Sequence, residues 1–214
     1  MSFSNETNQK NIVVAVVEKK NLDKKYIQIL DELIDKHNTL IFDYFEHGDK
    51  NLYPETIFLF GCLSRSVDLL LGCLNELKEE NIRSFYTLLR AQIETAAYIN
   101  YLKINPNYLD VAILGGRKED KGKKSISVIT MIKHLDKKIP NIYNQYEELS
   151  ERIHPNSATL YTNFKQLKKE DNNRIFEFCM KGTLDKDTYE KYLQWTIKIV
   201  INILSLITVD PKES

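Results

Sequence analysis

Apolar side chains recur every three or four residues along most of the chain, and this spacing predicts a mostly helical protein. The first such segment covers residues 22–47, with Asn21 suited to an N-cap and Gly48 to a helix stop. We expect a long amphipathic helix here. Its apolar positions are Tyr26, Ile27, Leu30, Leu33, Ile34, Leu40, Ile41, Tyr44 and Phe45.

Two further apolar segments, residues 54–80 and 82–102, are predicted to form the centre of the fold. Pro54 suits the first turn of a helix, because proline fixes a helical φ and needs no hydrogen-bond acceptor there. The tripeptide "EEN" leaves only a short connection between the two segments. Short connections join antiparallel neighbours, so the segments are expected to form a long helix hairpin.

The C-terminal half continues the helical pattern over residues 126–135, 142–153 and 185–209, with Pro140 at the joint between the first two. The last of these helices is apolar around most of its circumference and is expected to pack against several others. Its polar positions form one narrow stripe, consisting of Lys191, Gln194, Lys198, Asn202 and Ser205.

Several shorter segments complete the prediction. "YLDVAILGG" resembles a short helix, and residues 117–124 a charged surface loop. Residues 12–18 suit a strand or the first turns of a helix. Two aromatic stretches near residues 158–180 can pair as one small β-hairpin. The fold class is therefore all-α: a single helical-bundle domain over residues 12–210, built on the hairpin and preceded by a flexible tail, residues 1–11.

Composition and charge narrow the function classes. The 214 residues carry no net charge and include only seven glycines and five prolines, which argues against a many-stranded β-sandwich. Zero net charge removes the electrostatic basis for broad DNA or anionic-membrane binding. The N-terminus has no signal-peptide pattern, and no uninterrupted apolar run approaches the roughly 20 residues of a membrane span. We expect a cytoplasmic protein that does not enter the membrane.

The three cysteines, Cys62, Cys73 and Cys179, form no paired motif. They are expected to be reduced thiols, and core packing is the favoured role because free cysteine is usually buried. The chain also lacks the common zinc, phosphate-loop, nucleotide and serine-hydrolase motifs. No metal and no cofactor is predicted.

Only six of the thirty basic residues are arginine, and two of these lie in the lysine-free segment "RSFYTLLRAQIETAAYINYL". Fork-shaped arginine donors, a carboxylate and phenols on one side of a helix are typical of a cleft lining. Helical spacing places Arg83, Thr87, Arg90, Glu94, Tyr98 and Tyr101 on that side.

The preceding helix offers complementary charges. If the hairpin folds near residues 80 and 81, Arg65 is expected beside Glu94, and Asp68 beside Arg90. Three roles stay open for these residues: a charge ladder that fixes the hairpin register, a site for phosphate or another anion, and ordinary surface salt bridges.

His154 ends a helix, because Pro155 disfavours helical geometry at the preceding residue. Its spacing from Ser150 places both on one side of that helix. Two interpretations stay open. His154 can cap the last carbonyls of the helix, or it can act as a general acid/base or anion contact facing the arginine stripe.

The arginine segment, followed by "YEELSERIHPNS", resembles uncharacterised bacterial all-helical proteins similar in outline to HEPN-type bundles. This resemblance covers roughly residues 57–165 and implies a dimeric helical protein from a phage-defence or toxin–antitoxin locus, with a partner protein from the same locus. RNA-cleaving HEPN domains carry an arginine four to six residues before a histidine, whereas Arg152 precedes His154 by two. The positions carried over are Arg83, Arg90, Glu94, Ser150, His154 and Pro155.

Three functions follow as hypotheses. The leading one is a protein that binds a partner, RNA or a nucleotide through the polar cleft. The second is a metal-independent ribonuclease that uses His154 together with Arg83 or Arg90. The third is a non-catalytic interaction module in which the charges only hold the helices in register.

Overall fold

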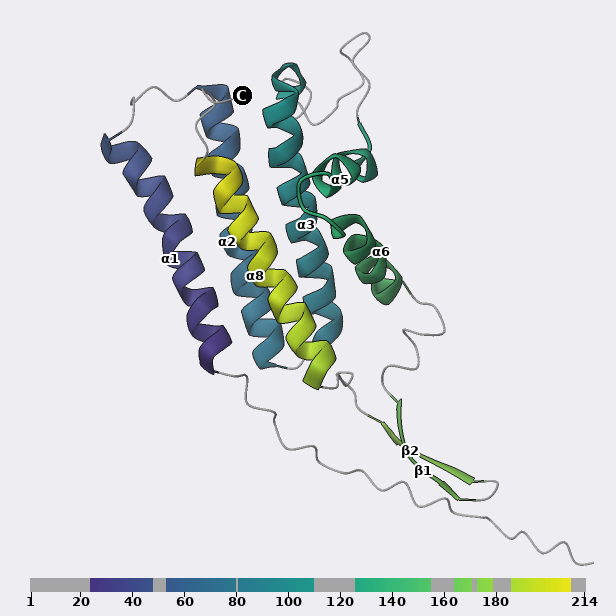
Figure 1. The fold of residues 1–214 in the computed structure, drawn as a ribbon. Helices are drawn as coiled ribbons and strands as arrows, with labels where there is room; N and C mark the ends of the chain where they lie inside the picture. The colour runs from purple at the N-terminus through teal and green to yellow at the C-terminus, as the bar shows by residue number, and fades with distance from the viewer. Residues whose placement is uncertain are drawn as a thin grey trace, which may run out of the picture.

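A computed structural model describes residues 24–47, 53–79, 81–109, 126–154, 164–170, 173–178 and 186–208. These residues form an all-α helical bundle accompanied by one short hairpin (Figure 1). The elements are α1 (Lys24–His47), α2 (Pro54–Lys78), α3 (Ile82–Ile104), the 3-10 helix η1 (Pro106–Tyr108), α5 (Val128–Asp136), α6 (Ile142–Ile153), β1 (Phe164–Glu170), β2 (Asn173–Phe178) and α8 (Lys186–Thr208).

The predicted antiparallel hairpin is confirmed by α2 and α3, which lie side by side along most of their lengths. Pro54 opens α2 in its first turn, as expected. Gly72 lets the two helices approach closely, because a Cβ atom there would lie 3.0 Å from Leu88 Cδ1. Helix α1 runs antiparallel to α2, and α8 runs in the same direction as α3 (Figure 1).

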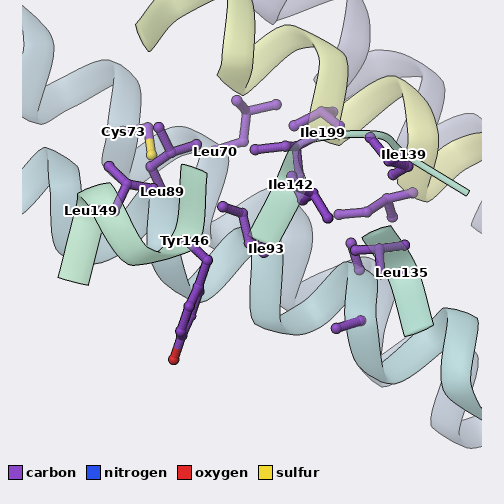
Figure 2. Packing of buried hydrophobic residues seen from close by; sticks show 14 of the residues in the cluster. Leu70, Cys73, Leu89, Ile93, Leu135, Ile139, Ile142, Tyr146, Leu149 and Ile199 are labelled. Atoms are coloured by element: carbon purple, nitrogen blue, oxygen red, sulfur yellow. The ribbon is translucent and has the colours of Figure 1, made fainter. Parts of the chain in front are cut away.

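Helix α3 is the centre of the bundle and packs against α2, α5, α6 and α8. Phe85, Leu89 and Ile93 on α3 are fully buried. Figure 2 shows Leu89 and Ile93 among aliphatic side chains from neighbouring helices, with Leu149 of α6 and Leu70 of α2 nearby. Because α3 contacts so many elements, polar residues along it can be held by partners from several directions.

The connection between α5 and α6 fixes the position of α6 on α3. Ser127 caps α5 by accepting a hydrogen bond from the Thr130 backbone N–H. Asn141, directly after Pro140, adopts a left-handed φ of 74°, a conformation that asparagine tolerates better than most residues. The Tyr143 backbone N–H then donates to the Asp136 side chain. These contacts orient α6 as it leaves the turn.

The small β-hairpin is also confirmed, since β1 and β2 pair antiparallel with Phe164 opposite Phe178. The final helix exposes its predicted polar stripe, with Asn202 half-buried. Several predictions lie outside the described residues: the tail 1–11, the segment 12–18, the short helix expected after Leu109 and the loop 117–124.

Within the described part of the chain, α2 is the one helix that is long and apolar enough to cross a membrane by length and composition. The same properties occur in the core helices of soluble proteins. Its Arg65 and Asp68 interrupt the apolar sequence near the middle of the helix. The packing of α2 against α1 and α3 accounts for its buried side.

Candidate functional site on helices α3 and α6

Arg90, Glu94 and Tyr146 form a polar triad where α6 crosses α3. Arg90 Nη2 donates to the Tyr146 hydroxyl at 2.7 Å, and that hydroxyl donates to Glu94 Oε1 at 2.9 Å. Arg90 Nε lies 3.3 Å from the same Glu94 oxygen, close enough for an ion pair although not aligned as a hydrogen bond. The Arg90 guanidinium also stacks on the Tyr146 ring at 4.8 Å. One tyrosine therefore links the two opposite charges.

The triad is held at the edge of the core rather than inside it. Tyr146 contributes its ring to the hydrophobic cluster, and Figure 2 shows its hydroxyl pointing away from the labelled aliphatic side chains. The side chains of Arg90 and Glu94 keep 30% and 27% of their exposure. Burial raises the pKa of Tyr146, so the hydroxyl stays protonated and able to donate.

The predicted ion pairs between α2 and α3 are wrong. Arg65 does not pair with Glu94; its Nε donates to the Thr95 hydroxyl at 3.2 Å. Asp68 is exposed and makes no hydrogen bond or ion pair with any residue the structure describes, so it does not pair with Arg90. The reason is the rotation of α3 about its own axis. Thr95, not Glu94, is the residue at this level whose side chain is buried toward α2.

The remaining residues of the arginine stripe do not share one environment. Arg83 and Thr87 are exposed, Tyr98 is half-buried, and Tyr101 is buried against Tyr108 and His134. The stripe therefore passes from solvent at the start of α3 into the core near its end. Arg83 and Thr87 are therefore the most accessible residues of the stripe.

His154 lies at the C-cap of α6, as its sequence position predicted, and its backbone N–H donates to the Ser150 carbonyl. Its side chain is exposed and makes no hydrogen bond or ion pair with the described residues. Ser150 is half-buried and donates to the Tyr146 carbonyl. The structure thus joins Ser150 to the Tyr146 turn but brings neither Arg83 nor Arg90 into contact with the imidazole.

A second polar cluster joins α6 to α8, and sequence reasoning missed it. Glu148 Oε1 accepts a hydrogen bond from the fully buried Tyr192 hydroxyl at 2.7 Å. Lys191 Nζ donates to both Glu148 oxygens, at 3.0 and 2.9 Å, and Arg152 Nε lies 3.7 Å away. Burial alone would raise the pKa of Glu148, but the Tyr192 and Lys191 hydrogen bonds outweigh it and hold that pKa below its usual value.

Part of this cluster could be recognised from the sequence. Glu148 and Arg152 are four residues apart on one helix, a spacing that suits an ion pair. Their partners come from a helix about forty residues later, and no local pattern identifies them. Arg152 also lies over the rings of Tyr86 and Tyr192, at 5.8 and 6.0 Å from their centroids. Arg152 of α6 therefore packs against α3 and α8.

A third network, fully buried among α1, α2 and α3, contains His37, which is not among the predicted site residues. His37 Nδ1 lies 2.7 Å from the Leu33 carbonyl, and Nε2 lies 3.2 Å from Ser66 Oγ. Gln92 Nε2 donates to Ser66 Oγ at 2.7 Å. Spacing could have revealed it, because His37 falls on the same side of α1 as the buried Leu30 and Leu33.

Cys62 and Cys73 are buried in the core, which confirms their predicted packing role, while Cys179 lies outside the described residues. Burial raises the pKa of both thiols to about 12. We therefore expect a Cys179→Ser protein to react with a thiol reagent at pH 8 only as fast as it unfolds, because the reactive thiolate is scarce and shielded. Reaction of one thiol within seconds in the native protein would contradict this expectation.

Among the residues that the structure describes, no group of three or more histidine, cysteine or acidic side chains is arranged to hold a metal ion. No protein-family model matches the chain, and searches of curated proteins and of solved structures returned no match.

Proposed function

We propose that the protein is a helical binding module that receives an anionic group, such as the phosphate of a nucleotide or of RNA, beside Arg90 on the α3–α6 seam. The seam is defined by Arg90, Glu94, Tyr146 and Ser150, with Arg83 on its open side. The observation that carries the proposal is the fixed orientation of Arg90, which is held from one side and still partly exposed.

A pre-oriented guanidinium suits this role. Arginine has five N–H donors in a planar fork that matches a phosphate or carboxylate. Tyr146 engages only Nη2, and Glu94 lies near Nε, so donors on Nη1 remain for a ligand. Because Tyr146 and Glu94 already fix the side chain, less rotamer entropy is lost when a ligand binds.

The arrangement favours binding over catalysis. The ribonuclease hypothesis needs His154 close to Arg83 or Arg90, and the imidazole contacts neither. We therefore assign no general acid/base to the site, and His154→Ala should leave anion binding within about two-fold of the parent.

The cellular setting is part of the same proposal. A cytoplasmic protein of a phage-defence or toxin–antitoxin locus would meet RNA, nucleotides and a partner protein from that locus. The support is the resemblance of the arginine segment and the Ser-x-x-x-His-Pro segment to HEPN-like proteins. The identity of neighbouring genes would test it directly.

The binding proposal is tested by titrating the protein with ATP and with a short single-stranded RNA, using calorimetry and fluorescence anisotropy. We expect Arg90→Met to raise the Kd about ten-fold or more, since one charge-assisted hydrogen bond is lost. Arg90→Lys should recover part of the affinity, because lysine keeps the charge without the fork.

Lys133→Met is the matched control. Lys133 is exposed and lies over the Tyr143 ring of α6 at 5.2 Å, so this variant also removes one cation and one ring contact near the seam. Its Kd should stay within about two-fold of the parent. No measurable binding of either ligand, or equal losses in Arg90→Met and Lys133→Met, would contradict the proposal.

A further inference from the structure

The hairpin of β1 and β2 is too small a sheet to be stable by itself. The two strands pair with each other, and their contacts with the described helices are minor by comparison. Their register puts Phe164 opposite Phe178, and Phe176 falls on the same face two residues earlier. An isolated two-stranded hairpin is at best marginally stable in water, whereas three strands with an apolar face can be stable. The hairpin therefore needs a further element to pair with.

The two outer edges of this sheet differ in character. β1 has three lysines among its seven residues, and its pairing with β2 skips Leu167. Lysines and bulges are features that keep an open edge strand from pairing further. In β2, three of the six residues are isoleucine or phenylalanine, none is lysine, and no residue is skipped. β1 therefore has the character of an open edge, and β2 that of a central strand whose second edge is unpaired among the described residues.

A segment with the composition of a strand precedes α1. Residues 12–17, which we call the N-terminal segment, read "IVVAVV" and include five β-branched side chains. Such side chains are enriched in strands. The six residues also match the length of β2. The segment lies outside the described residues, and its sequence pattern alone left strand and helix open.

The direction of the helices brings the N-terminal segment and β2 to the same end of the bundle. Helix α1 is antiparallel to α2, whereas α3 and α8 run in one direction, opposite to α2, so α1 and α8 begin at the same end (Figure 1). Residues 18–23 join the segment to α1, and residues 179–185 join β2 to α8. Connections of six and seven extended residues reach at most about 20–25 Å. Both strands are therefore tethered to neighbouring helix ends by connections of nearly equal length.

We propose that the N-terminal segment forms a third strand, which pairs with the free edge of β2. Each of the two chain segments runs toward the end of the bundle where its helix begins, so the two strands are parallel. Nearly equal connections place Val17 beside Phe178, to within about one or two residues. The order of the sheet is then β1, β2 and the third strand, with the lysine-rich β1 at the open edge. None of these residues belongs to the α3–α6 seam, so the third strand is independent of the anion site.

Residue-resolved hydrogen–deuterium exchange of the full chain tests the third strand. In the parent, we expect protection of amides in the N-terminal segment and of the β2 amides that do not pair with β1. Val13→Pro and Val14→Pro are compared, because neighbouring amides point to opposite sides of a strand and only one of the two can donate to β2. At least one of these variants should speed exchange of both sets of amides about ten-fold or more.

Asn5→Pro, in the polar residues before the segment, is the matched control and should leave exchange unchanged. Amides of α3 should keep the parent rate in all three variants, which shows that the bundle is folded. Unprotected amides in residues 12–17, or β2 amides that neither proline affects, overturn the proposal. Protection of β2 that grows with protein concentration also overturns it, because the strand would then come from a second copy.

Discussion

Ser66→Ala is expected to lower the free energy of unfolding by about 1–3 kcal/mol, because it leaves buried polar groups without partners. Ser66 is fully buried and links His37 Nε2 to Gln92 Nε2 through one hydroxyl. Alanine cannot replace either hydrogen bond. The measurement is urea unfolding at pH 7.5, followed by circular dichroism.

Ser64→Ala provides the control, since it is the same substitution on the exposed side of the same helix. It shares any gain in helix propensity but removes no buried hydrogen bond, so its effect should stay within about 0.5 kcal/mol. Equal effects of the two substitutions would mean that the network contributes nothing measurable to stability.

The network also predicts how stability depends on pH. Because the Leu33 carbonyl can only accept, His37 Nδ1 carries the proton, and Nε2 of the neutral ring accepts from the Ser66 hydroxyl. Burial lowers the pKa of His37 below its usual value, and the Leu33 hydrogen bond offsets this only in part. The unfolded chain therefore takes up the proton first as the pH falls.

It follows that the free energy of unfolding should decrease below about pH 6.5, by at most about 1.4 kcal/mol per pH unit, until the folded-state pKa is reached. In His37→Gln, which cannot titrate, this part of the pH dependence should disappear. His154→Gln should leave it intact, because His154 is not part of the buried network of His37, Ser66 and Gln92.

The axial positions of residues in the hairpin could be predicted from sequence, but their rotation could not. Folding the chain near residues 80 and 81 placed Arg65 beside Glu94, and the Arg65–Thr95 hydrogen bond shows that the true neighbour is one residue further along α3. A rotation of one residue, about 100°, decides which of the two faces α2. That rotation is set by α5, α6 and α8, which pack on other sides of α3, and no local pattern reports it.

Tertiary packing, which no local pattern reports, also explains why the triad of Arg90, Glu94 and Tyr146 could be predicted only in part. The spacing of Arg90 and Glu94 on one helix was visible in the sequence, and the structure pairs them at 3.3 Å. Tyr146, which links them, comes from a helix about fifty residues later. Sequence analysis did not single out Tyr146, whose ring packs in the core. Only the tertiary arrangement shows that its hydroxyl reaches the charges.

Tyr192→Ala should destabilise the fold more than Ser66→Ala does, with a loss of about 3–5 kcal/mol in the free energy of unfolding. Tyr192 is fully buried and has edge-on ring contacts with Phe85, Tyr86 and Trp195, at centroid distances of 6.3, 5.0 and 5.2 Å. Alanine would leave a cavity where α3, α6 and α8 meet.

Tyr192→Phe separates the ring from the hydroxyl. It keeps the packing but removes the hydrogen bond to Glu148, so it should cost about 1.5–3 kcal/mol, the range for a hydrogen bond to a charged group. Thermal and urea unfolding of both variants measure the two contributions. If Tyr192→Phe cost as much as Tyr192→Ala, the hydroxyl and its carboxylate, and not the aromatic packing, would be what holds α8 against α6.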